Sequence, residues 1–180
     1  MKLLVITSLK HKASKNLIKF LKFKKISFDC VDTSSNRKIK ITKNYDFLIS
    51  FLNPVYINKS IRNKIKKKSY NFHPGPPEYP GFGCYNFAML NKAKFYGSTV
   101  HEINDKFDNG RIIDVKTFKI SYGKLTLDKL IKFTHKNLAQ QSKLIINRII
   151  SGKKIILKKK INWKRKAFTK KEFEMSRKIS

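Results

Sequence analysis

Acidic residues, cysteine, glycine and proline are all scarce in this chain of 180 residues. It has 11 Asp and Glu against 42 Lys and Arg, with 2 Cys, 7 Gly and 5 Pro. So little Gly and Pro excludes collagen-like and low-complexity proteins. The two cysteines, Cys30 and Cys84, have no metal-ligand spacing and fit a reducing compartment. No apolar run approaches the roughly 18–20 residues of a membrane-spanning helix, and the N-terminus lacks the apolar stretch of a secretory signal. We therefore expect a cytoplasmic protein with no membrane partner.

The formal net charge of +31 accompanies enough apolar residues to build a core. Hydrophobic residues make up 41% of the chain and aromatic residues 12%, which is more than a disordered chain of this charge would have. The charge suggests a polyanionic partner, such as a nucleic acid, an anionic membrane or a phosphorylated substrate. The excess is mostly Lys, however, and abundant Lys, Ile, Asn and Phe is also what an AT-rich genome encodes. Both explanations stay open.

Strand-like and helix-like segments alternate along the chain. This alternation predicts an α/β fold, a mostly parallel sheet with helices on both faces. We expect one domain over residues 1–152, and a short basic C-terminal tail, residues 153–180, packing on or beside it. The hydrophobic pattern predicts strands at 2–7, 26–31, 45–52, 69–72, 98–103 and 111–120, an edge strand at 155–157, and helices at 12–24, 58–67, 85–92 and from about 126 to 152.

The usual signatures of nucleotide, metal and serine-nucleophile sites are missing. The turn after the first strand has no glycine, the histidines lack zinc spacing, and no Gly-x-Ser-x-Gly occurs. What remains is Asn71 and His73 at the end of a predicted strand, followed by a Pro-rich loop and, further on, Asp108 in a Gly-containing turn. Ligands of such sheets bind beyond the carboxyl ends of the strands.

These three residue types can do chemistry together. Asn71 and His73 are two positions apart on a strand, so they share a face. The Asn71 amide can donate to an oxyanion, and His73 can act as an acid, a base or a cation near neutral pH. Asp108 can orient the imidazole and relay a proton through water. Each alone could be structural, with His73 capping its strand and Asp108 making a turn, but the ordered set indicates an active site.

The same region resembles the 10-formyltetrahydrofolate-dependent formyltransferase family. The resemblance lies in residues 71–81 (NFHPGPPEYPG), 97–101 (GSTVH) and 108–113 (DNGRII), and extends from about residue 45 to 150. It implies a Rossmann-like formyltransferase fold and an enzyme of one-carbon metabolism, a transferase that uses 10-formyltetrahydrofolate as co-substrate and no metal. By this resemblance, Asn71, His73 and Asp108 are the catalytic residues.

The resemblance also implies where the substrates lie. The pterin of the folate would contact the segment after the central strand and the turn opposite it, namely Leu52, Asn53, Pro54, Val55, Tyr56 and Ile57 with Ile103, Asn104 and Asp105. The acceptor would contact Pro74, Gly75, Pro76 and His101. For His101, a buried and hydrogen-bonded histidine is an equally good interpretation.

The acceptor is the least constrained part of this hypothesis. Many relatives have a small residue and Ser-Leu-Leu-Pro after the motif histidine, where this chain has Pro74-Gly75-Pro76-Pro77. We expect a small-molecule amine, most simply a nucleotide-linked amino sugar. Methionyl-tRNA stays open as the acceptor, although the residues after Ile150 are too few for the β domain that those enzymes usually append. Glycinamide ribonucleotide also stays open, although this chain lacks the Gly/Ser-rich phosphate loop that those enzymes have after the first strand.

A second class of hypothesis is a non-catalytic basic protein that binds RNA on the same fold. Its contacts would come from Lys64–Lys68 and Trp163–Lys171, where basic and aromatic residues are interleaved. The intact set of Asn71, His73 and Asp108 argues against it, because binding alone requires none of them. Homodimerisation through the tail or a sheet edge stays open.

Overall fold

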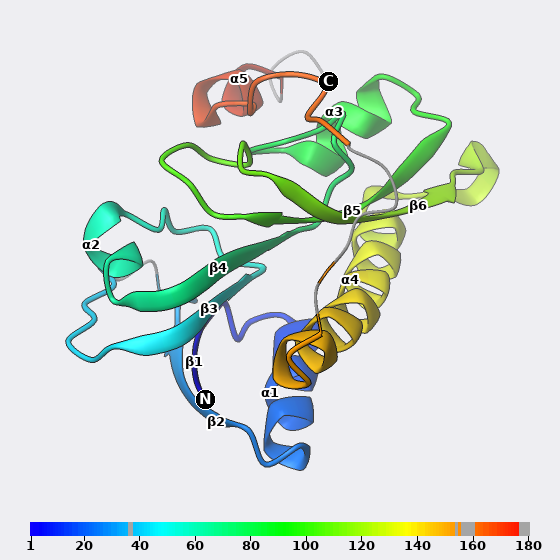
Figure 1. Ribbon diagram of the computed structural model, residues 1–180. Helices are drawn as coiled ribbons and strands as arrows, with labels where there is room; N and C mark the ends of the chain where they lie inside the picture. Colours follow the sequence, from blue (N-terminus) through cyan, green and yellow to red (C-terminus); the bar gives the residue numbers. More distant parts are fainter. Residues whose placement is uncertain (36–37, 154, 156–160, 177–180) are drawn as a thin grey trace.

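The computed structural model describes residues 1–35, 38–153, 155 and 161–176, and these contain a six-stranded sheet with helices around it (Figure 1). The sheet order is β2-β1-β3-β4-β5-β6. The strands are β1 (Lys2–Thr7), β2 (Ser27–Asp32), β3 (Tyr45–Phe51), β4 (Ile65–His73), β5 (Phe95–Glu102) and β6 (Ile112–Lys119). The helices are α1 (Lys12–Phe23), α2 (Lys59–Arg62), α3 (Cys84–Leu90), α4 (Leu127–Ile150) and α5 (Lys170–Ser176), with a 3₁₀ turn, η1, at Tyr122–Lys124.

The first four strands of this order are parallel and the last two are antiparallel. Strand β1 pairs in parallel with β2 and β3, and β3 pairs in parallel with β4. Strands β5 and β6 then add as antiparallel neighbours. The prediction of a mostly parallel α/β sheet is confirmed, and the carboxyl ends of β1, β3 and β4 lie at one edge of it.

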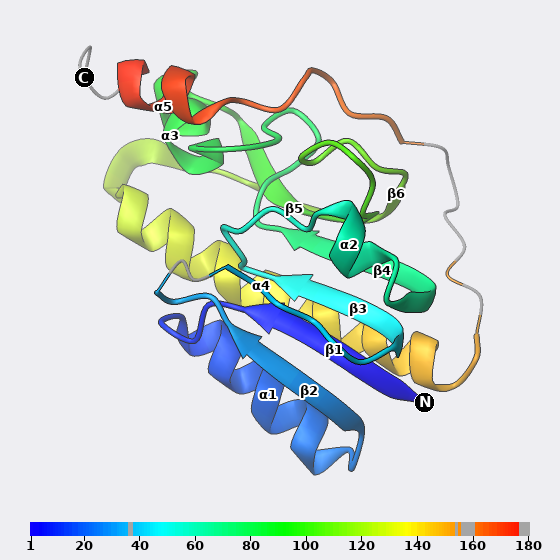
Figure 2. The ribbon, with the colours of Figure 1, turned by 90° about the vertical axis from the view of Figure 1, so that its left-hand side faces the viewer.

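Strand β1 is central because both of its faces are buried. Leu3 and Val5 pack on one face with residues of α1 and α4, while Leu4 and Ile6 pack on the other with Ile61 of α2. Helices α1 and α4 lie together on the first face, and α2 lies on the opposite one (Figure 2). A continuous apolar run such as that in β1 is typical of a strand covered on both sides.

The predicted helix at 58–67 is wrong over most of its length. Helix α2 is a single turn, Lys59–Arg62, whose first turn is capped by the Asn58 side chain accepting a hydrogen bond from the Ile61 backbone N–H at 3.0 Å. The residues from Ile65 onward belong to β4 and pair with β3. A run of lysines shows no periodic pattern of apolar residues from which a helix or a strand could be predicted. Its strand conformation is set by pairing with the edge of β3.

Residues 161–176 run across the β5–β6 side of the molecule and end in α5, which lies beside α3 (Figures 1 and 2). Phe168 is buried, and its ring stacks on Phe87 of α3 at 3.7 Å between centroids. The predicted edge strand at 155–157 falls outside the described residues except for Ile155, which is in no strand. Among the residues described, no helix has the length and apolarity needed to cross a membrane.

Leu17 and Phe23 of α1 provide a matched test of the core. Leu17 is 1% exposed and Phe23 is 81% exposed. We expect Leu17→Ala to lower the free energy of unfolding by about 2–5 kcal/mol, because it leaves a cavity between α1 and the sheet. Phe23→Ala should change it by less than about 0.5 kcal/mol. Urea unfolding of both variants measures this, and equal losses would contradict the assignment of the buried face.

Candidate active site

Strands β4 and β5 bring three polar side chains together. Asn71 and His73 are the last alternate residues of β4, and the antiparallel register pairs Asn71 with His101 of β5. His73 and His101 are both almost fully buried. The pairing therefore places two imidazoles and one amide in a small volume at the edge where the parallel strands end.

The turn between β5 and β6 delivers Asp108 to this group. Asp108 is 7% exposed and has a φ of 37°, a left-handed conformation that costs a non-glycine residue free energy. Gly110 closes the turn, where an added Cβ would lie 1.7 Å from the Glu102 carbonyl oxygen, so only glycine fits. The sequence between His101 and Ile112 thus folds so that one carboxylate points back at β4.

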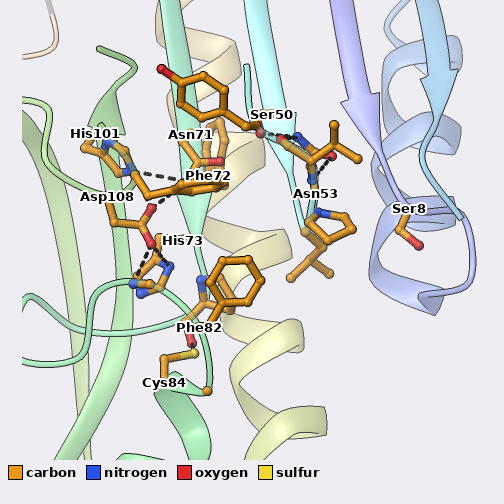
Figure 3. Close-up of a pocket in the computed structure, with 18 of the residues that line it drawn as sticks. Ser8, Ser50, Asn53, Asn71, Phe72, His73, Phe82, Cys84, His101 and Asp108 are labelled. Atoms are coloured by element: carbon orange, nitrogen blue, oxygen red, sulfur yellow. Dashed lines mark hydrogen bonds and ion pairs between the residues drawn. The ribbon is translucent and has the colours of Figure 1, made fainter. Parts of the chain in front are cut away.

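Four groups converge on the Asp108 carboxylate (Figure 3). Its Oδ2 lies 3.0 Å from His73 Nδ1 and accepts a hydrogen bond from the Gly81 backbone N–H at 2.7 Å. Its Oδ1 accepts from Asn71 Nδ2 at 3.1 Å and lies 3.1 Å from His101 Nε2. The structure therefore brings the predicted catalytic residues Asn71, His73 and Asp108 into direct contact.

The surroundings of His73 favour its protonated form. Nδ1 faces Asp108 and Nε2 lies 2.9 Å from the carbonyl oxygen of Tyr79, so both ring nitrogens face acceptors and both must donate. Burial alone would lower the pKa of His73, but the Asp108 charge and the hydrogen bonds to Asp108 and Tyr79 raise it above its usual value. Burial would likewise raise the pKa of Asp108, yet the charges and hydrogen bonds of His73 and His101 hold it well below its usual range.

His101 is held by its own network. Its Nδ1 lies 2.8 Å from the Glu102 carbonyl oxygen and so carries a hydrogen, and its Nε2 lies 3.1 Å from Asn71 Nδ2. A buried and hydrogen-bonded histidine, which was one of the two interpretations of this residue, is what the structure contains. The same ring also lines the cavity described next.

A cavity of about 420 Å³ opens beside these side chains. Its walls include the carboxyl end of β3 and the turn after β5. Asn53 shapes the first wall, because its side chain accepts from the Val55 N–H at 3.0 Å and donates to the Val55 carbonyl at 2.8 Å. Of the residues predicted to contact the pterin, the cavity is lined by Leu52, Asn53, Pro54, Val55, Tyr56, Ile57, Ile103 and Asn104.

Asp105 has a different place from its predicted neighbours. Its side chain points away from the cavity to an ion pair with Arg62, and its backbone carbonyl accepts a hydrogen bond from the Tyr56 hydroxyl at 2.8 Å. Tyr56 also packs against Phe107, with 5.2 Å between ring centroids. Asp105 thus joins the two walls rather than lining them.

The predicted acceptor residues are also divided. Pro74 lines the cavity, whereas Gly75 and Pro76 are buried behind His73. The Gly75 carbonyl accepts from the Thr99 hydroxyl at 2.8 Å, and a Cβ at position 75 would lie 2.5 Å from His73 Nε2. These two residues support the His73 imidazole from the side away from the cavity.

Other lining residues had no signal in the sequence that singled them out. Ser8 and His11 come from the segment between β1 and α1, and His135 comes from α4. The rings of His11 and His135 are in a T-shaped contact with 5.0 Å between centroids. Burial lowers the pKa of His135 to about 4, helped by His11, so the pair is uncharged at neutral pH. The aromatic rings of the lining were missed as well, namely Phe82, Tyr85, Phe107 and Phe173.

The cavity combines groups suited to acyl transfer. An amide donor and an imidazolium can stabilise a developing oxyanion, and an adjacent carboxylate can take part in proton transfer. In the described part of the chain, no three His, Cys, Asp or Glu side chains are grouped so that they could hold a metal ion.

Comparisons with known sequences point to one family. A family model described as formyl transferase matches residues 48–149. The bifunctional polymyxin resistance protein ArnA of Wigglesworthia glossinidia brevipalpis is 30% identical over 118 residues, which cover 65% of this chain and 17% of ArnA. The chain therefore corresponds to a small part of that relative.

Solved structures agree in fold. The formyltransferase PseJ of Anoxybacillus kamchatkensis, in complex with UDP-4,6-dideoxy-4-formamido-L-AltNAc and tetrahydrofolate, matches with a TM-score of 0.73 and 21% identity over 93% of this chain and 84% of PseJ. WlaRD, a sugar 3N-formyl transferase in the presence of dTDP and 5-N-formyl-tetrahydrofolate, matches with a TM-score of 0.75 and 21% identity over 96% of this chain and 70% of WlaRD. At such identities the likeness establishes the fold.

Asp108→Asn tests the ion pair directly. The variant keeps the shape of the side chain but removes the charge that stabilises protonated His73, while the burial that opposes protonation stays. We therefore expect the pKa of His73 to fall below its wild-type value. Titration of the four histidine ring signals by NMR measures this, with His135→Gln as the control that leaves the His73 signal in place. An unchanged His73 titration in Asp108→Asn would contradict the pairing.

His135 predicts a loss of stability in acid. Its pKa of about 4 in the folded protein lies below its ordinary value of 6.5, so the unfolded chain binds a proton that the folded one excludes. Stability therefore falls as the pH drops from 6.5 towards 4. We expect a smaller fall of the melting temperature over this range in His135→Gln than in the wild type. The same dependence of the melting temperature on pH in both proteins would contradict this expectation.

Proposed function

The chain belongs to the formyl transferase family, and we propose that it transfers the formyl group of 10-formyltetrahydrofolate to the primary amine of a nucleotide-linked amino sugar. The observation that carries this proposal is the contact of Asn71, His73 and Asp108 beside a cavity of about 420 Å³. An amide, an imidazolium and a carboxylate at one edge of a ligand-sized cavity fit acyl transfer better than simple binding, which needs no such set.

The donor site is assigned to the end of the cavity between the β3 wall and the turn after β5. This end has the apolar walls that a flat heterocycle requires, with Leu52, Val55 and Ile103 among its lining residues. The hydrogen bond from Tyr56 to Asp105 ties the two walls together, so the slot is shaped before the folate binds.

In the proposed reaction the acceptor nitrogen attacks the formyl carbon. A new C–N bond forms and the carbonyl π pair moves to oxygen, where the Asn71 amide and the His73 imidazolium stabilise the negative charge. Collapse of this intermediate breaks the bond from carbon to N10 of the folate. The acceptor nitrogen loses one proton and N10 gains one, with Asp108 assisting through water.

His73 has to exchange a hydrogen-bond partner in this scheme. Its Nε2–H is directed at the Tyr79 carbonyl, so the formyl oxygen competes with that carbonyl for the same hydrogen. Its Nδ1–H stays on Asp108, which keeps the ring charged while the other nitrogen turns to the substrate. The exchange is between two oxygen acceptors and leaves the ion pair intact.

The amino-sugar acceptor is supported by the relatives. ArnA carries a matching segment, and PseJ and WlaRD are structures with a nucleotide or nucleotide sugar and a folate. The cavity is also lined by Ser8 and His11 from the segment after β1 and by His135 of α4. In the proposal the acceptor amine enters the cavity along these residues.

Offering acceptors in parallel tests the reaction. Release of tetrahydrofolate from 10-formyltetrahydrofolate is followed by absorbance with UDP- and dTDP-linked amino sugars, methionyl-tRNA and glycinamide ribonucleotide. We expect one of the sugar nucleotides to accelerate release well above background. Acceleration by tRNA alone, with activity falling steeply as salt rises, would replace the proposed acceptor, and failure of the folate to bind would overturn the function.

Asn71→Ala tests the oxyanion role in the same assay. Loss of one oxyanion donor should lower kcat by about 100- to 1000-fold, with the fold retained. Asn147→Ala, an exposed asparagine on α4, is the matched control and should keep wild-type activity. Equal activity of the two variants would remove Asn71 from the mechanism.

A further inference from the structure

Residues 161–173, called the C-terminal strap from here on, run along the Pro-rich loop that follows His73. The Lys164 N–H donates to the Pro77 carbonyl at 3.0 Å, and the Phe168 N–H donates to the Pro80 carbonyl at 2.9 Å. The Phe82 N–H donates back to the Phe168 carbonyl at 3.0 Å. The loop is thus joined by backbone hydrogen bonds to a segment more than 80 positions away in sequence.

Gly81 lies between the strap and the catalytic carboxylate. A Cβ at this position would lie 2.4 Å from the Phe168 carbonyl oxygen, and the residue has a φ of 87°, so a side chain is excluded on both grounds. Its N–H is the group that donates to Asp108 Oδ2 at 2.7 Å. The strap therefore fixes the backbone from which one of the four contacts on Asp108 comes.

Trp163 of the strap reaches the cluster from another side. Its Nε1–H donates to the Gly110 carbonyl at 2.8 Å, two residues after Asp108. Its ring makes T-shaped contacts with His101 and His73, with centroids at 5.1 and 5.9 Å. The indole thus touches the turn that carries Asp108 and both imidazoles that contact the carboxylate.

The turn needs such a hold because its geometry is strained. Asp108 has a positive φ, which costs of order 1–3 kcal/mol and persists only where surrounding contacts over-determine it. A turn free to relax would move the carboxylate from His73 Nδ1. An aromatic ring against the cluster also keeps water from that side, which strengthens the ion pair.

We propose that Trp163 is a positioning residue for formyl transfer, holding the Asp108 carboxylate against the His73 imidazole through the Gly110 carbonyl and the edges of both histidine rings. The inference rests on the proposed function for its catalytic consequence, whereas its structural consequence is independent of substrate. Trp163 itself has no contact with Asn71 or with the β3 wall among the interactions described, so its action is through the histidines and the turn.

The groups around His73 are few and define what a titration would report. The Asp108 carboxylate, the Tyr79 carbonyl and the Trp163 ring contact its imidazole. His101 contacts the same carboxylate, and the Cys84 thiol of α3 lines the same cavity. Burial raises the pKa of Cys84 to about 12, so this thiol is neutral throughout the relevant range. A change in the titration of His73 on substitution of Trp163 therefore reports the distance and order of Asp108 and His101.

Two substitutions test the proposal without substrate. Trp163→Phe keeps an aromatic ring and loses the hydrogen bond to Gly110, and Trp163→Ala loses both. We expect the pKa of His73, read from its NMR signal, to be lower than wild type in Trp163→Phe and lower still in Trp163→Ala. Phe23→Ala, an exposed aromatic residue on α1, should leave it unchanged.

Trp163 is the only tryptophan of the chain, so the wild-type protein supplies a second readout. A protonated imidazole in contact quenches indole emission more strongly than a neutral one. Emission should therefore rise as His73 loses its proton, and this step should be absent in His73→Asn. A wild-type emission that shows no step at the His73 transition would overturn the proposed contact.

Kinetics then test the catalytic consequence. We expect kcat of Trp163→Ala to fall by about 10- to 100-fold, the scale of a displacement of about 1 Å in a catalytic group, with KM for the folate within about twofold of wild type. The alkaline limb of the rate profile should move to lower pH, because His73 loses its proton earlier, and Trp163→Phe should restore part of the rate.

The outcomes separate this proposal from the function on which it rests. A lower melting temperature with an unchanged His73 titration and an unchanged alkaline limb means that Trp163 only packs, which overturns the proposal. If Trp163→Ala does not fold, the His73 titration of Trp163→Phe and the pH dependence of the wild-type emission test the proposal instead. If no acceptor is formylated although the His73 titration shifts as expected, the proposed function fails and the positioning of the cluster by Trp163 still holds.

Discussion

The buried Asp108 carboxylate is the interaction on which the other parts of the site depend. A lone charge buried this deeply would cost several kcal/mol, but His73, Asn71, the Gly81 N–H and His101 surround it. Each neighbour comes from a different segment or strand position, so the carboxylate is stabilised only when those segments are in register. The same contacts raise the pKa of His73 and so favour its protonated form. The stability of this edge of the fold and the chemistry of the site therefore have one electrostatic origin.

The change from parallel to antiparallel pairing makes this convergence possible. Because β5 runs against β4, its last residues lie beside Asn71, and His101 faces it directly. The turn after β5 can then fold back over both strands, with Gly110 allowing the close approach to Glu102. A crossover to a fifth parallel strand would carry the chain away from this edge. The Pro-rich loop after His73 and the strap close the remaining side.

Among the described residues, little of the large positive charge lies in the lining of the cavity. Among the described residues that line the cavity, Lys106 is the only lysine or arginine, and the other basic side chains there are histidines. A lysine beside Asp108 would compete with His73 for the carboxylate. The net charge of +31 therefore comes from lysines and arginines of which, in the described residues, only Lys106 lines the cavity, and a charge of this size raises the local concentration of anions around a protein. This is compatible with a phosphorylated or nucleotide-linked acceptor.

Local pattern was enough to predict much of this molecule. The apolar run of β1 and the spacing of Leu17 and Leu21 in α1 follow from side-chain burial within a few residues. The order Asn71, His73, Asp108 singled out three side chains that the fold brings into contact. The extension of β4 through the lysines, the meeting of His11 with His135, and the place of Trp163 against Gly110 could not be read in this way. Each is a contact between segments that are distant along the chain, and no periodic pattern in the sequence predicts it. Each forms only when the sheet has brought the two segments together.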